Sequence, residues 1–227
     1  IVIPKSVKII GEHAFSCGDN LAEIRFESKK TKYDSPKDCN AIIETKTNSL
    51  ILGCKNTTIP DEVKVIKESA FSSCSFKSIL IPSNVIEIED YAFAWCNLTS
   101  ITIPKNVTHI GKNAFHGCYF LESIILNNGI TAIEDHSFQY CKNLASIIIP
   151  DSVKTIGKEA FDDCTSLVSV TLNEGITHIG DFTFRNCSNL QSITLPESIV
   201  SIGKGAFEGC TSLTAINIPS NVSSIGD

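Results

Sequence analysis

Cysteine offers this chain its widest choice of chemistry, because a thiol can form a disulfide, bind a metal ion or attack a substrate. The 227-residue sequence contains ten cysteines, and eight of them recur two or three residues after a phenylalanine. Those eight are Cys17, Cys74, Cys96, Cys118, Cys141, Cys164, Cys187 and Cys210. From Cys74 onward their spacing is 22 or 23 residues, so whatever these thiols do is repeated in every unit of a repeating structure.

Neither a disulfide nor a metal site fits this spacing. If residues one repeat apart lie above one another, their Cβ atoms are ~4.7–4.9 Å apart and point the same way, whereas disulfide-bonded Cβ atoms lie ~3.8 Å apart and face each other. The sequence has no Cys-x-x-Cys pair, and its five histidines are scattered. We therefore expect no metal site and interpret the recurring cysteines as reduced, buried thiols that act as small hydrophobic side chains.

Serine is the second candidate for chemistry, because it recurs with the same period. The recurring positions are Ser78, Ser100, Ser123, Ser146, Ser169 and Ser192. A nucleophilic serine needs a general base and a group that orients the base, and the neighbouring column of residues holds neither histidine nor carboxylate. No cluster of His, Asp, Glu or Cys gathers within any one repeat either. We therefore expect no catalytic residue, no cofactor and no enzymatic activity.

The elements that position these residues follow from a recurring phenylalanine. It occurs at Phe15, Phe71, Phe93, Phe115, Phe138, Phe161, Phe184 and Phe207. In the clearest repeat, residues 98–103 read Leu-x-x-Ile-x-Ile and predict a short strand. Residues 107–111 (Val-x-x-Ile-Gly) predict a second extended piece, and residues 114–118 (Ala-Phe-x-x-Cys) predict a turn of α or 3₁₀ helix. One such coil cannot bury its apolar edge, so neighbouring coils must cover it.

The repeat unit resembles that of a known family. Residues 149–167 read Ile-Pro-x-x-Val-x-x-Ile-Gly-x-x-Ala-Phe-x-x-Cys-x-x-Leu, which is similar to the repeat of BspA-like leucine-rich repeat proteins of bacteria and protists. The resemblance implies a curved, right-handed leucine-rich-repeat solenoid of stacked β-strand coils, with short 3₁₀ or helical turns on the return side. It also implies a secreted or surface-anchored protein that contacts other proteins, in some members host matrix proteins, and it carries over no catalytic residues.

The repeats extend over the whole sequence, so we expect residues 1–227 to form a single leucine-rich-repeat domain. The chain begins at the end of a strand and stops within a repeat, without polar capping coils, which indicates a segment of a longer array. Any secretion signal or anchor is then expected outside this segment.

One repeat is irregular. Phe15 and Phe71 are separated by 56 residues, which indicates a long coil at residues 27–53. Within it, residues 41–52 predict a β-hairpin insertion near the N-terminus. Cys39 and Cys54 flank the hairpin and could pair in an oxidising compartment; the residues alone leave both the disulfide and the two separate thiols open.

Charge and hydropathy exclude two classes of partner. The net charge is −6 with a pI near 5.4, and no basic stripe is present, so nucleic acid and anionic membrane surfaces are not expected partners. No apolar run approaches the ~18 residues that would indicate a membrane span.

Contact residues are expected on the concave face of the strands, between the inward-facing positions. The candidates are Leu80, Thr102, Ile125, Ile148, Thr171 and Thr194. Ile125 and Ile148 stand where Thr is otherwise common, and with Tyr119 and Phe120 they could form a hydrophobic contact patch. The alternative is that β-propensity alone selects them.

These observations together predict a non-enzymatic binding module of an extracellular or cell-surface protein, with protein or glycan partners such as host matrix or surface proteins. The alternative function is a structural spacer that presents another domain at the cell surface.

Overall fold

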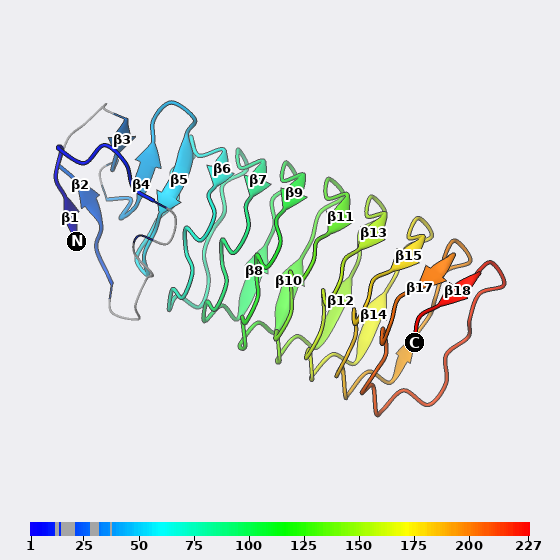
Figure 1. Ribbon diagram of the computed structural model, residues 1–227. Helices are drawn as coiled ribbons and strands as arrows, with labels where there is room; N and C mark the ends of the chain where they lie inside the picture. Colours follow the sequence, from blue (N-terminus) through cyan, green and yellow to red (C-terminus); the bar gives the residue numbers. More distant parts are fainter. Residues whose placement is uncertain (12–13, 15–20, 28–31, 37) are drawn as a thin grey trace.

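The computed structural model describes residues 1–11, 14, 21–27, 32–36 and 38–227. Its coils stack along one axis into an elongated solenoid, with the two termini at opposite ends (Figure 1). The leucine-rich-repeat solenoid expected from the sequence is therefore confirmed. Phe15 and Cys17, the first members of their columns, lie outside the described residues.

The first strand ribbon runs along one side of the stack. It consists of β8 (Ser100–Thr102), β10 (Ser123–Ile125), β12 (Ser146–Ile148), β14 (Ser169–Thr171) and β16 (Ser192–Ile193). The paired strands are parallel and in register, with serine opposite serine. Because side chains alternate along a strand, this register points every middle residue of the three-residue strands inward and leaves its two neighbours exposed.

A second strand ribbon forms the return side, as residues 107–111 predicted for one coil. It consists of β6 (Val65–Ile66), β7 (Glu87–Ile88), β9 (His109–Ile110), β11 (Ala132–Ile133), β13 (Thr155–Ile156), β15 (His178–Ile179), β17 (Ser201–Ile202) and β18 (Ser224–Ile225). These strands also pair in parallel, except that β9 and β11 belong to separate sheets.

The hairpin insertion near the N-terminus is present. After β1 (Val2–Ile3) and β2 (Arg25–Phe26), β3 (Tyr33–Asp34) pairs antiparallel with β4 (Ile42–Glu44), and β4 pairs antiparallel with β5 (Ser49–Leu52). β5 then pairs in parallel with β6, so the hairpin extends the second ribbon. The boundaries 27–53 of the irregular coil stay a prediction.

The expected helical turn was wrong, since no residue of the described chain is helical. In the segment where the turn was expected, backbone N–H groups donate in turn within the coil and to the next coil. The N–H of Ala94 donates to the Tyr91 carbonyl of its own coil (3.0 Å). Those of Phe93 and Trp95 donate to carbonyls of the next coil, at Ala114 (2.8 Å) and His116 (2.7 Å). Positive φ at Tyr91 (55°) and Trp95 (57°) turns every second amide outward. A helix cannot form because half of its donors bond between coils.

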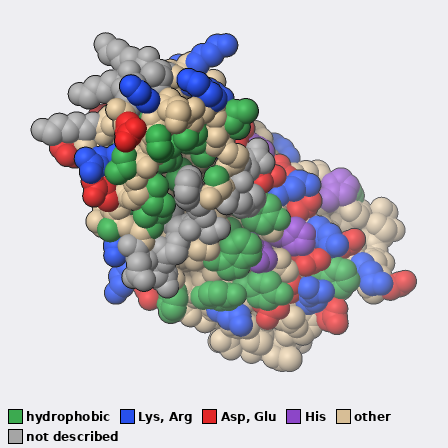
Figure 2. Space-filling view, turned by 60° about the vertical axis from the view of Figure 1, so that its left-hand side comes forward, with side chains coloured by type: hydrophobic (Ala, Val, Ile, Leu, Met, Phe, Trp, Pro, Cys, Tyr) green, Lys and Arg blue, Asp and Glu red, His purple; other side chains and the backbone are tan. Residues whose placement is uncertain are grey.

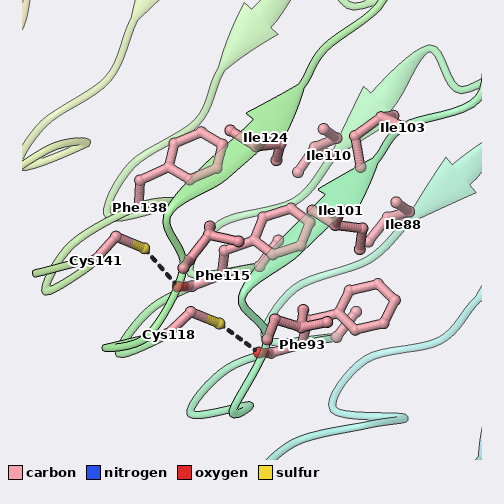
Figure 3. Packing of buried hydrophobic residues seen from close by; sticks show 14 of the residues in the cluster. Ile88, Phe93, Ile101, Ile103, Ile110, Phe115, Cys118, Ile124, Phe138 and Cys141 are labelled. Carbon is pink, nitrogen blue, oxygen red and sulfur yellow. Dashed lines mark hydrogen bonds between the residues drawn. The ribbon is translucent and has the colours of Figure 1, made fainter. Parts of the chain in front are cut away.

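The interior is a stack of phenylalanine rings. Successive rings from Phe71 to Phe207 lie 5.2–5.6 Å apart and within 11° of parallel. Phe93, Phe115 and Phe138 show this arrangement, with the isoleucines of both ribbons around them (Figure 3). Six of the seven rings are fully buried. Each sequence repeat therefore adds one ring to a single continuous hydrophobic core.

Candidate functional site

The candidate contact residues form an exposed column on the outer surface of the first ribbon. Leu80, Ile125 and Ile148 are 83%, 63% and 72% exposed, although isoleucine and leucine are usually buried. Thr102, Thr171 and Thr194 are exposed in the same column. We call these six residues the outer column. Their exposure is what the structure shows, while their place on a concave face and their role in binding stay predictions.

A shallow depression interrupts the ribbon between Ile125 and Ile148. β10 and β12 are adjacent but belong to separate hydrogen-bonded sheets, and a depression of about 290 Å³ lies between them. Its lining comprises Ser123, Ile124, Ile125, Leu126, Asn128, Ser146, Ile147, Ile148 and Pro150. The two isoleucines that depart from the threonine pattern are thus brought together at the point where the ribbon is least regular.

Tyr119 and Phe120 do not belong to this depression. Both are exposed, but neither lines it, and the Lys142 ammonium lies 5.7 Å from the centre of the Tyr119 ring. The contact patch of Ile125 and Ile148 with Tyr119 and Phe120 stays a prediction.

The recurring cysteines are more than small hydrophobic side chains. Each thiol from Cys96 to Cys210 donates a hydrogen bond of 3.0–3.3 Å to the carbonyl of the phenylalanine one coil before, as Cys118 does to Phe93 (Figure 3). Desolvation by burial raises the pKa of Cys118 to about 12 and that of Cys210 to about 11. Such thiols are poor nucleophiles, so the column acts as a ladder that satisfies buried carbonyls.

Cys39 and Cys54 are both buried beside the hairpin. The Cys39 thiol donates to the carbonyl of Ala41, and the Cys54 thiol donates to that of Asn40, each over 3.5 Å. The two thiols thus donate to the carbonyls of two adjacent residues. Their pairing in an oxidising compartment stays a prediction.

A polar network that the sequence analysis missed lies on the edge between the second ribbon and the core. Arg185 donates two hydrogen bonds to the fully buried Asp162 (2.9 and 2.6 Å). Gln139 donates to Asp162 (2.8 Å) and to Glu159 (2.9 Å), and the Nδ1 of His136 lies 3.1 Å from Gln139. The hydrogen bond that Arg185 donates to Asp162 raises the pKa of Arg185. Arg185 forms ion pairs with both Glu159 and Asp162, so the network joins three successive coils.

The signal for this network was in the sequence, at the position after each phenylalanine. Gln139, Asp162 and Arg185 occupy that position in three successive coils. The search for clusters within single repeats could not find it, because the network joins residues of different repeats.

Neither metal binding nor membrane insertion is indicated in the described part of the chain. No three His, Cys, Asp or Glu side chains there are arranged to hold a metal ion. No helix there is long and apolar enough to cross a membrane. On the flank seen in Figure 2, acidic and basic side chains are interspersed with histidines.

Known structures share this architecture. A leucine-rich repeat protein from Eubacterium ventriosum is 31% identical, with a TM-score of 0.84, over 98% of this chain and 60% of its own. The chain thus spans less than two thirds of that relative. A T. pallidum leucine-rich repeat protein is 29% identical, with a TM-score of 0.67, over 85% of each chain. A Bacteroides ovatus leucine-rich repeat protein, 23% identical with a TM-score of 0.61, covers all of this chain and 83% of its own, and shares the fold.

Among curated proteins, no sequence matches the chain significantly. The family model of the BspA-type leucine-rich repeat region, which spans six copies of the repeat, matches residues 1–49, 47–153 and 131–227. These matches cover the sequence from end to end and agree with the stacked coils and the phenylalanine core. The chain therefore belongs to the BspA-type leucine-rich repeat proteins.

Proposed function

We propose that the chain is a non-enzymatic binding module of a secreted or cell-surface protein and that it holds protein partners on its first ribbon. The observation that carries the proposal is the exposure of Leu80, Ile125 and Ile148 on a ribbon whose other outward residues are small hydroxyl side chains. Exposed hydrophobic side chains that neighbour one another often mark contact surfaces. The BspA-type family supports the surface location, because such proteins are associated with secretion and surface anchoring.

A solenoid suits this function because its frame is rigid. The phenylalanine stack and the two ribbons fix the outer column at one residue per coil, so little order has to be gained on binding. Affinity then comes from modest contacts summed over successive coils, with the two isoleucines as the anchor.

The test uses residues 1–227 as immobilised bait for extracellular-matrix and serum proteins. We expect the wild-type chain to retain a defined protein and the Ile125→Thr/Ile148→Thr variant to lose it. The control variant Ile86→Thr/Val200→Thr removes two exposed hydrophobic side chains outside the outer column and should retain the protein.

Two results would contradict the proposal. If both variants retain the partner protein equally well, the binding site does not include Ile125 and Ile148. If the wild-type chain retains neither a protein nor a glycan from these mixtures, the alternative function, a structural spacer, would replace it.

A further inference from the structure

A row of acidic side chains borders the depression on the first ribbon. Asp151, Glu174 and Glu197 occupy the same position, 23 residues apart, in three successive coils. All three are exposed, and successive coils place them ~4.7–4.9 Å apart along the stack. We call these three residues the acidic row. It begins directly after Pro150, which lines the depression.

Ion pairs within the described part of the chain leave the acidic row unneutralised. Among the described residues none of its carboxylates forms an ion pair, and Glu197 accepts only a 3.4 Å hydrogen bond from Ser220. Two cations lie nearby: Lys154, whose ammonium donates to the Asp151 carbonyl (3.5 Å), and the exposed Lys105, two coils before Asp151 in the same column. Three neighbouring carboxylates facing one adjacent lysine leave this border negative.

The ribbon beside the acidic row is uncharged. From Ser100 to Thr194, its two outward columns contain only Ser, Thr and Ile. A partner can therefore lay uncharged and apolar groups across the ribbon without burying a charge, while basic groups at its border gain from the acidic row. A glycan fits less well, because neither column offers an aromatic ring or an amide to hold a sugar.

We infer that this face receives an extended segment of a protein partner that combines an apolar side chain with lysines or arginines. The apolar side chain enters the depression between Ile125 and Ile148. The basic side chains lie against Asp151, Glu174 and Glu197. The inference rests on the proposed function and names the chemistry of the partner.

The experiment selects a phage-displayed library of random 12-residue peptides on immobilised residues 1–227. The selected peptides are then synthesised, and their affinities are measured by fluorescence anisotropy. We expect them to be basic with at least one large apolar residue. Their binding should weaken about tenfold or more, equivalent to ~1.4 kcal/mol, in Ile125→Thr/Ile148→Thr and in Asp151→Asn/Glu174→Gln/Glu197→Gln. It should also weaken when salt rises from about 50 to about 500 mM.

A charge-matched variant separates a local effect from the net charge. Asp61→Asn/Glu62→Gln/Glu122→Gln removes the same three negative charges from exposed positions outside the acidic row and should bind within about twofold of wild type. Equal melting temperatures of all variants, measured by circular dichroism, establish that each is folded.

The possible failures are distinguishable. Selected peptides that are neutral or acidic, or that bind the acidic-row variant as tightly as wild type, would overturn the inference and leave the proposed binding function standing. Glycan binding or self-association that is lost in Ile125→Thr/Ile148→Thr would assign this face to another occupant. If no peptide is enriched and no matrix or serum protein is retained, both the inference and the proposed function fail.

Discussion

At the scale of single residues, each repeat position has a physical role that its neighbours in adjacent coils define. Phenylalanine fills the core, cysteine donates to the carbonyl of the phenylalanine one coil before, and the outer column is exposed. The inward positions were predictable from the sequence because hydrophobic periodicity reveals burial. The thiol–carbonyl bonds were not, because they depend on carbonyl directions that no residue pattern reports.

Substitutions in the core should lower the free energy of unfolding much more than substitutions on the ribbon surface. Phe161 is fully buried between the rings of Phe138 and Phe184, so Phe161→Ala should leave a cavity and cost on the order of 3–5 kcal/mol of unfolding free energy. The exposed Thr171→Ala should stay within about 0.5 kcal/mol. Urea denaturation measures both, and comparable midpoints would show that the inward assignment is wrong.

His116 should make stability depend on pH. Its Nδ1 is buried and has no hydrogen-bond partner among the described residues. Desolvation by burial, followed by the nearby His136, lowers its pKa below 6.5 in the folded state. The unfolded chain therefore binds a proton that the folded chain resists, so the stabilising contribution is present above pH 6.5 and is lost as pH falls through the lower folded pKa.

Thermal melting of wild type and His116→Gln between pH 7.5 and 5 measures this contribution. The difference in melting temperature between the two proteins should shrink or reverse as pH falls. A difference that does not change with pH would contradict the role of His116.

At the scale of elements, charge alternates between successive coils at one corner of the second ribbon. From β7 to β17, the position two residues after the last isoleucine of the strand holds Asp90, Lys112, Asp135, Lys158, Asp181 and Lys204 in turn. The Oδ1 of each aspartate accepts the backbone N–H of the following lysine, at 2.7, 2.9 and 2.8 Å. Each of these aspartates therefore bonds to the backbone of the next coil. The alternation was visible in the sequence, but the contacts were not.

Glycine precedes each of those lysines for a steric reason, which gives a matched test. A Cβ on Gly157 would lie 2.6 Å from the Asp135 Oδ1 and 2.7 Å from its backbone nitrogen, so Gly157→Ala should cost about 1–3 kcal/mol through overpacking. Glu134 occupies the same repeat position one coil earlier, where a Cβ already fits, and Glu134→Ala should be nearly neutral. Similar melting temperatures of the two variants would refute the close approach.

The helical turn is the element that sequence reasoning misjudged. Ala-Phe-x-x-Cys looks helical because its apolar residues are three apart, yet Tyr91, Trp95 and their equivalents adopt positive φ. Tyr91 and Trp95 are not typical of that conformation, although equivalent positions in other coils hold Asn113, Asp163, Asn186 and Gly117, which favour it. The bonds between coils are common to all the repeats, whereas residues that favour positive φ occur only in some of them, so the signal is weak in any single repeat. The hairpin at residues 41–52 was predictable because both its strands and its turn are local.

At the scale of the whole molecule, function depends on the stack rather than on any single coil. The depression, the acidic row and the polar network of Asp162 each join residues from two or more coils. Sequence analysis found the outer column because it is a single repeat position. It could not find the depression, since the break between β10 and β12 arises from how two coils fit together.

The stacking of residues 22 or 23 apart can be measured directly with pairs of spin labels, attached through a genetically encoded ketone so that the native cysteines stay untouched. One label stands at Thr194 and the other at Thr102, Leu80 or Thr58, which lie four, five and six coils away in the same exposed column. Electron–electron double resonance should give three distances that increase by ~4.7–4.9 Å per coil. Distances that fail to increase in equal steps would contradict the solenoid and the binding face built on it.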